Sequence, residues 1–161
     1  MMQTYPVRRK DRILPEEEAS QLLERGEYGF LATIGKDGVP YAVPLSYVVL
    51  EGNVYFHCAL DGRKVDNLRF CPKVSFAVVG NTQPIFDKTF TTYYESAIAF
   101  GTVDEVSDAE EKFRVLYLLS EKYLPDHMSK APDAIQSSLA KVSVYRLEVA
   151  SVTGKVKRPQ P

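Results

Sequence analysis

The sequence is poor in the residues that build disulfides and zinc sites. It has no tryptophan, and its 161 residues include only two cysteines and two histidines. Cys58 and Cys71 are too few for a disulfide framework and do not form a CxxC motif, so we interpret both as reduced thiols. A zinc site would have to recruit both cysteines, His57 and His127 together, or add carboxylates. We therefore expect no metal.

The sequence also has no excess of positive or of negative charge. The 20 basic and 21 acidic side chains give a net charge of −1. General nucleic-acid and membrane-surface binders carry a basic footprint, so we expect neither partner. The start, MMQTYPVRRKDRILPEEE, has no apolar run typical of a signal peptide or membrane span, which indicates a cytoplasmic protein. Length and composition fit one globular domain over residues 1–161.

Neither the dinucleotide fingerprint GxGxxG nor the phosphate loop GxxxxGK[ST] occurs. Alternating apolar residues are present instead. They predict strands over 28–34, 39–50, 54–59, 74–79, 96–106 and 141–152, with a loop at Pro84. The first three strands, joined by turns at Asp37-Gly38 and Gly52-Asn53, are predicted to form an antiparallel meander. Many short strands favour a mainly β barrel or sandwich, because closure removes exposed edges.

Helices are fewer. Pro15 and Gly26 bracket a predicted helix over 14–26. A stretch over 62–70 is long enough for one or two turns. The SDAEE stretch that begins at Ser107 is typical of a capping box, and an apolar stripe continues from it to a helix end near Pro125.

The stretch YFHCALDGRKVDNLRF over residues 55–70 begins as a strand and ends as a helix. Arg63 and Lys64 follow Gly62 at the bend, where the N–H groups of a helix start would add to their charge. This arrangement suits a phosphate, because Arg grips two oxygens and Lys acts as a point charge. The alternative is a solvated pair of cations on a surface turn.

His57 shares a strand face with Tyr55 and Ala59 in the predicted alternation. Its ordinary pKa near neutrality suits a residue that delivers a proton. The alternatives are a buried histidine paired with a carbonyl and an exposed one without a role. Spacing does not distinguish them.

The succession LATIGKDGVPYAVPLSYVVLEGNVYFHCALDGRKVDNLRFCPKVSFAV, followed later by ESAIAFGTVDEV, resembles the flavin-binding split-barrel proteins related to pyridoxamine 5′-phosphate oxidase. Within them it is most similar to the 5-nitroimidazole-reductase-like branch. The resemblance implies a six-stranded antiparallel split β-barrel of Greek-key type with flanking α-helices. It also implies a homodimer with one FMN in each of two clefts between subunits.

The resemblance further implies roles for particular residues. The phosphate site matches Gly62, Arg63 and Lys64, and the partner subunit contributes Ser96. The catalytic histidine of the reductase-like branch matches His57. The strands along the flavin ring match Pro44, Leu45, Ser46, Tyr47, His57, Cys58 and Ala59. The oxidase's C-terminal aromatic and arginine residues have no clear counterpart in the closing stretch TGKVKR, which argues against oxidation of pyridoxamine phosphate.

These expectations define an FMN-dependent oxidoreductase that reduces a small acceptor, such as a nitro compound or a quinone, with electrons from a reduced nicotinamide. One alternative is a non-catalytic flavin or haem binder, with His57 as an axial haem ligand. Another is a structural dimer without a cofactor. A deazaflavin in the same cleft is a further alternative. The acceptor, the donor and the pathway stay open at this point.

Overall fold

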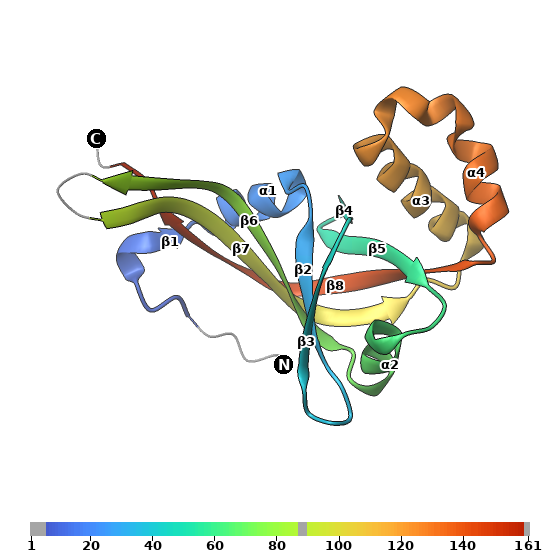
Figure 1. Ribbon diagram of the computed structural model, residues 1–161, viewed down its shortest axis with the longest axis horizontal. Coiled ribbons are helices and arrows are strands. Elements are labelled where there is room, and N and C mark those ends of the chain that lie inside the picture. The colour runs from blue at the N-terminus through green and yellow to red at the C-terminus, as the bar shows by residue number, and fades with distance from the viewer. Residues whose placement is uncertain (1–5, 87–89, 160–161) are drawn as a thin grey trace.

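Long antiparallel strands dominate the computed structural model, which describes residues 6–86 and 90–159 (Figure 1). The strands are β1 (Ile13–Leu14), β2 (Gly29–Ile34), β3 (Pro40–Leu45), β4 (Val48–Leu50), β5 (Asn53–Ala59), β6 (Lys73–Phe86), β7 (Phe90–Glu105) and β8 (Val142–Lys157). The helices are α1 (Glu16–Arg25), α2 (Arg63–Phe70), α3 (Ala109–Tyr123) and α4 (Ala131–Ser138), with 3₁₀ segments η1 (Lys10–Arg12) and η2 (Pro125–Lys130). The mainly β class with flanking helices is confirmed.

The strands form one sheet in the order β3-β2-β6-β7-β8-β5-β4, with β1 paired to β8. β3 and β4 stand at opposite ends of this order, yet only Ser46 and Tyr47 separate them along the chain. The sheet must therefore curl until its two end strands come close together. This is the geometry of a split barrel, in which the chain crosses from one edge to the other at Ser46-Tyr47.

Two details of the predicted sheet need correction. The predicted strand over 39–50 is two strands, and with β1 the described residues contain eight strands rather than six. The predicted meander is also wrong, because β3 pairs with β2 while β4 pairs with β5. Apolar alternation continues through Ser46-Tyr47, so the local pattern carries no sign of the crossing. The crossing is decided by the strands that pair with β3 and β4, which are β2 and β5.

Three strands are longer than predicted and form an arm that projects to one side of the barrel (Figure 1). Pro84, which we expected in a loop, lies in β6 opposite Thr92. β6 pairs with β2 only over Ser75, Phe76 and Ala77, so beyond them it is an edge strand, and an edge accommodates proline on its unpaired side.

Two groups of buried side chains hold the fold together. One fills the barrel and includes Leu31, Phe56, Phe76 and Leu147. The other lies between the sheet and the α3–α4 layer, and includes Val115 and Ile135. Asp108 caps α3 by accepting a hydrogen bond from the backbone N–H of Glu111 at 2.8 Å, so the cap is one residue later than the predicted capping box. We did not predict α4, a short helix whose apolar face is complete only against α3.

None of the helices in the described part of the chain is long and apolar enough to cross a membrane.

Candidate functional site

The turn between β5 and α2 has the conformation that the sequence motif requires. Gly62 precedes α2 with a φ of +115°, a region that side chains rarely allow, and an added Cβ would meet no atom within 4 Å. The glycine is therefore needed for its backbone rather than for space. Buried Asn67 anchors α2 to β2 by donating to the Thr33 hydroxyl at 2.9 Å. The start of α2 is thus held in a defined place beside the barrel.

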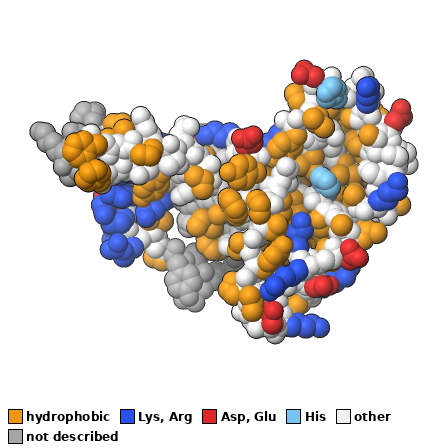
Figure 2. Space-filling view, viewed as in Figure 1, with side chains coloured by type: hydrophobic (Ala, Val, Ile, Leu, Met, Phe, Trp, Pro, Cys, Tyr) orange, Lys and Arg blue, Asp and Glu red, His pale blue; other side chains and the backbone are white. Residues whose placement is uncertain are grey.

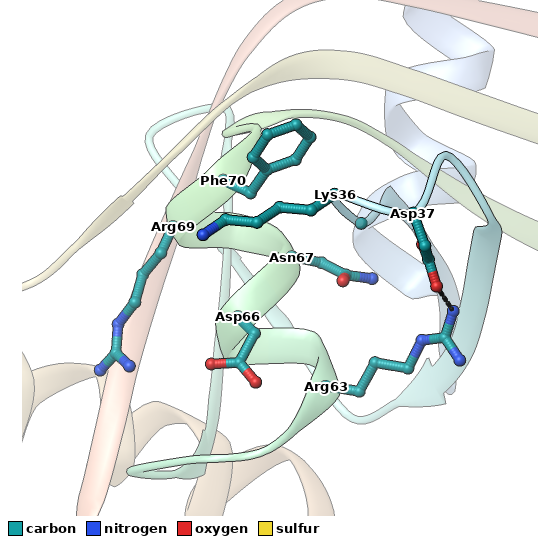
Figure 3. Close-up of a pocket in the computed structure, with 8 residues that line it drawn as sticks. Lys36, Asp37, Arg63, Asp66, Asn67, Arg69 and Phe70 are labelled. Atoms are coloured by element: carbon teal, nitrogen blue, oxygen red, sulfur yellow. Dashed lines mark hydrogen bonds and ion pairs between the residues drawn. The ribbon is translucent and has the colours of Figure 1, made fainter.

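The two predicted phosphate-binding cations diverge from this turn. Arg63 turns toward the β2–β3 link, where its guanidinium lies 3.4 Å from the Asp37 carboxylate (Figure 3). The guanidinium also lies 5.3 Å from the centre of the Tyr41 ring of β3. Lys64 turns toward the barrel, with its Nζ 5.8 Å from the centre of the Phe56 ring. The motif therefore places positive charge on both sides of the start of α2.

A charged pocket of about 830 Å³ opens beside α2. The described residues that line it are Gly35, Lys36, Asp37, Arg63, Asp66, Asn67, Arg69 and Phe70. Figure 3 shows Arg63 meeting Asp37 at one end, while Lys36 and Arg69 lie toward the other end of the helix. Charged side chains of both signs also surround the α2 end in Figure 2. The pocket suits an anion held by cations that are themselves balanced by acids.

β5 presents its predicted site residues to two different sides. His57 lies on the face toward α3–α4, opposite Val144 of β8. Cys58 points the other way and packs against the barrel core, while Ala59 is exposed. Burial raises the pKa of the Cys58 thiol more than the Lys64 charge lowers it, so the thiol stays protonated. Of these three residues, His57 has the side chain suited to proton transfer.

The charge of Lys64, at the start of α2, acts on His57 of β5. The His57 ring reaches the surface of the isolated chain, but neighbouring groups remove part of its water. This partial desolvation and, second, the nearby Lys64 charge lower the pKa of His57. The imidazolium is therefore a stronger acid than a free histidine and is less populated at neutral pH.

A second cavity, of about 290 Å³, lies between His57 and the α3–α4 layer. Its apolar lining comes from Leu116, Leu119, Leu124, Ala134 and Ile135, and its polar lining from Ser46, His57, Ser120, Tyr123 and Ser138. It brings Ser46 and His57 together, as expected for two strands that flank one ring. The predicted residues Pro44 and Leu45 end β3, directly before Ser46. Pro44 is exposed, and Leu45 packs on the core.

The barrel crossing at Ser46-Tyr47 is held by two side chains of α3. The Tyr123 hydroxyl accepts from the Tyr47 N–H at 3.0 Å and donates to the Glu27 carbonyl at 2.6 Å. The Lys122 ammonium donates to the carbonyls of Gly26 at 2.7 Å and Tyr47 at 3.1 Å, and burial lowers its pKa. The Tyr47 side chain itself is fully buried. Tyr47 therefore supports the position of Ser46 from within the core.

Sequence reasoning missed Lys122 and Tyr123. A lysine followed by a tyrosine at the end of an amphipathic helix is typical of a solvated surface. No local signal separates these two residues from ordinary helix-end residues, because their backbone partners come from the α1–β2 and β3–β4 links, far away in the sequence.

Ser96 lies apart from the other predicted site residues. It is on β7 between Val79 of β6 and Lys155 of β8, on the face that points away from the barrel interior. The next row on this face is Phe30, Ala77, Ile98 and Thr153. Val79 is 59% exposed and Ile98 is 37% exposed. This outer face thus presents apolar side chains next to Ser96.

The described residues contain no cluster of three or more His, Cys, Asp and Glu side chains that could hold a metal ion.

Comparison with known proteins identifies the family. The sequence profile of pyridoxamine 5′-phosphate oxidase matches residues 15–156. The chain belongs to this family. The match spans the barrel from α1 to the end of β8, including both cavities.

Solved structures with the same fold carry different names. One is a candidate 5-nitroimidazole antibiotic resistance protein of Bacteroides thetaiotaomicron, with a TM-score of 0.77, 23% identity, and coverage of 89% of this chain and 86% of that one. Another is the flavocytochrome Anf3 of Azotobacter vinelandii (TM-score 0.85, 18% identity, coverage 98% and 75%). A third is an FAD and haem binding protein of Mycobacterium smegmatis (TM-score 0.78, 18% identity, coverage 94% and 76%). At these identities the likeness establishes the fold.

Proposed function

We propose that this pyridoxamine 5′-phosphate oxidase family member is an FMN-dependent oxidoreductase that reduces a small acceptor, such as a nitro compound or a quinone, with a reduced nicotinamide as electron donor. The observation that carries the proposal is that Ser46 and His57 line one cavity while Lys64, at the phosphate motif, is close enough to affect the pKa of His57. The strand segments that we assign to the flavin ring therefore lie next to the phosphate motif, and the cavity opens beside them. The name of the Bacteroides protein supports a nitro compound as one acceptor class.

The residues around α2 fit an FMN phosphate. A phosphate dianion needs strong donors, and Arg63, Lys64 and the free N–H groups in the first turn of α2 supply them. The Arg63–Asp37 pair is exposed, so its loss costs little when Arg63 turns to a phosphate. The ring would lie along the Pro44–Ser46 backbone and β5, where Ser46 and His57 offer hydrogen-bonding groups.

When bound, FMN supplies two-electron transfer between the nicotinamide and the acceptor. A hydride from the nicotinamide carries two electrons and one proton, so a quinone needs one further proton to become a hydroquinone. We assign that proton to His57, which faces the cavity and whose lowered pKa makes its imidazolium a stronger acid.

We also propose a homodimer. An outer face with Phe30, Val79 and Ile98 exposed is typical of an interface with a second copy. Ser96 lies on this face and away from the chain's own His57, so it can reach a cofactor only across a subunit boundary. A stable monomer in sedimentation at micromolar concentration, with flavin still bound, would contradict this arrangement.

A non-catalytic flavin or haem binder is the second candidate. The name of the Mycobacterium protein, which includes haem, and that of the Azotobacter protein, a flavocytochrome, support this candidate. An accessible imidazole such as His57 can serve as an axial haem ligand. Haem at His57 would occupy the place that we assign to the acceptor, so the two functions compete for one residue.

The identity of the bound molecule tests both candidates. We expect the purified protein to show flavin absorbance bands and to release FMN on denaturation. It should then oxidise a reduced nicotinamide in the presence of a quinone, and His57→Ala should keep FMN but slow turnover. A Soret band without flavin would support the haem binder and overturn the oxidoreductase. Full flavin occupancy with an unchanged rate in His57→Ala would remove His57 from the reaction.

A further inference from the structure

The cavity beside His57 differs from the α2 pocket in the charge of its walls. Among the described residues that line it, none carries a charge at neutral pH apart from the protonated fraction of His57. The lining side chains Leu116, Leu119 and Ile135 are buried and form an apolar wall on the helical side. An anionic ligand that entered would lose water against the apolar wall and would find no permanent charge among these lining side chains.

The polar groups on the helical side are already engaged. The hydroxyl of Ser120 donates to the Leu116 carbonyl at 2.9 Å, and that of Ser138 donates to the Ile135 carbonyl at 2.9 Å. Tyr123 is held by its contacts at the barrel crossing. The hydrogen-bond donors left to meet a ligand, among the described lining residues, are Ser46 and His57 on the sheet side. The cavity thus has an apolar wall opposite a polar one.

We infer that the α3–α4 layer makes this cavity an acceptor pocket that selects small uncharged acceptors and directs their reducible oxygen toward His57 and Ser46. The inference rests on the proposed function and adds to it the substrate class and the element that sets specificity. The apolar body of the acceptor packs on Leu119 and Ile135, where burial provides the affinity. An anionic acceptor of the same ring size is rejected.

Binding can be measured apart from turnover. The chain contains five isoleucines, at positions 13, 34, 85, 98 and 135, so isoleucine-methyl NMR gives a simple spectrum with one probe in this cavity. Menadione, an uncharged quinone, should shift the Ile135 methyl signals, and 1,4-naphthoquinone-2-sulfonate should shift them at much higher concentration. If menadione leaves Ile135 unchanged, the pocket assignment is wrong, whatever the activity of the protein.

A charge placed in the wall tests selectivity. Ser138→Lys adds a cation to the lining at the end of α4, where a helix tolerates positive charge. It should raise kcat/KM for the sulfonate relative to menadione by roughly tenfold or more, because the buried anion gains a charged hydrogen bond. Ser137→Lys is the matched control, since the neighbouring Ser137 is exposed and does not line the cavity. Comparing each variant's ratio with that of wild type removes the difference in reduction potential between the quinones.

The outcomes separate the two claims. A wild-type protein that holds no flavin, or that turns over no acceptor, overturns the proposed function, and the Ile135 shifts then still decide whether the cavity binds an uncharged ring. A wild-type protein that turns over both quinones, with equal ratios in Ser138→Lys and Ser137→Lys, leaves the oxidoreductase standing and overturns the selective pocket. Flavin absorbance of each variant verifies that the cofactor is retained.

Discussion

Two cavities border the same strand-to-helix segment, and they differ in almost every physical respect. The α2 pocket is lined by Lys36, Asp37, Arg63, Asp66 and Arg69, whereas apolar side chains and satisfied hydroxyls form most of the cavity under α3–α4. β5 and α2 are joined by a short link, so the two environments lie close to each other. The difference shows how one small barrel can offer a charged pocket and a largely uncharged cavity to different parts of a reaction.

The contrast also has a structural cause. The α2 pocket forms between two segments of the barrel itself, α2 and the β2–β3 link, which carry its charges on exposed turns. The uncharged cavity needs α3 and α4, which come from a long insertion between β7 and β8 and pack on the outer face of β4 and β5. The barrel by itself supplies the charged pocket, while the largely uncharged cavity requires a second layer.

The largest expected effect concerns the ionic side, by which we mean the phosphate motif and the α2 pocket. Arg63→Ala and Lys64→Ala should each weaken FMN binding by roughly ten- to a hundredfold, because a charge-assisted hydrogen bond contributes about 1.5–3 kcal/mol. The double variant should lose FMN on purification. Riboflavin, which has no phosphate, should respond little. Fluorescence titration of both flavins measures this, after circular dichroism has verified the fold.

Arg114→Ala is the control for these variants, since this exposed arginine of α3 pairs only loosely with Glu51, at 4.0 Å. A loss confined to Lys64→Ala would leave Arg63 as a surface residue bound to Asp37. Equal losses for FMN and riboflavin would mean that the cleft as a whole is damaged, and the contrast between an ionic and an uncharged place would then fail.

The next effect, smaller than that of the double variant, is expected at the barrel crossing beside the cavity under α3–α4. Lys122→Met should lower the free energy of unfolding by about 2–3 kcal/mol, because two backbone carbonyls lose a charged donor. The variant should also slow turnover by displacing Ser46, while the ratio of FMN to riboflavin affinity stays unchanged. Urea unfolding and flavin titration measure the two consequences.

Lys130→Met, at an exposed position of η2, is the matched control for Lys122→Met. Equal unfolding midpoints for the two variants would show that the Lys122 contacts at the barrel crossing do not stabilise the fold. A changed FMN-to-riboflavin ratio in Lys122→Met would show that the two sides are not independent.

The smallest effect tests whether the charge of Lys64, at the phosphate motif, acts on His57 in the uncharged cavity. Partial burial and the Lys64 charge both lower the pKa of His57, so its proton-donating form is lost as pH rises through this lowered pKa. Lys64→Gln should therefore raise the pKa of His57 toward its ordinary value, only in part because the desolvation remains. The pH at which proton delivery declines should rise with it.

NMR titration of the imidazole signals in the cofactor-free protein gives this pKa directly, without any effect of Lys64 on FMN binding. His127 lies on η2 and provides the reference signal. A pKa of His57 that falls, or does not move, in Lys64→Gln would place Lys64 too far away to connect the ionic and uncharged sides.

Much of the molecule follows from local sequence. Apolar alternation predicted the barrel part of each long strand but not the arm formed by the outer parts of β6, β7 and β8. Pro15 and Gly26 located α1 to within two residues. The Gly62-Arg63-Lys64 motif predicted a helix start, because glycine alone readily adopts the φ of +115° found there. Alternation also placed His57 and Cys58 on opposite sides of β5. These features depend on residues that are neighbours in the chain.

Tertiary structure alone decided the rest. The break at Ser46-Tyr47, the roles of Lys122 and Tyr123, and the divergence of Arg63 from Lys64 all depend on partners many residues away. The same holds for the cavity of about 290 Å³, whose walls come from β5, α3 and α4. A sequence pattern records which face of an element is apolar, but not which other element will cover that face. Closure of the sheet made that choice, because only a curled sheet brings its two end strands together and leaves β4 and β5 to be covered by the helices inserted before β8.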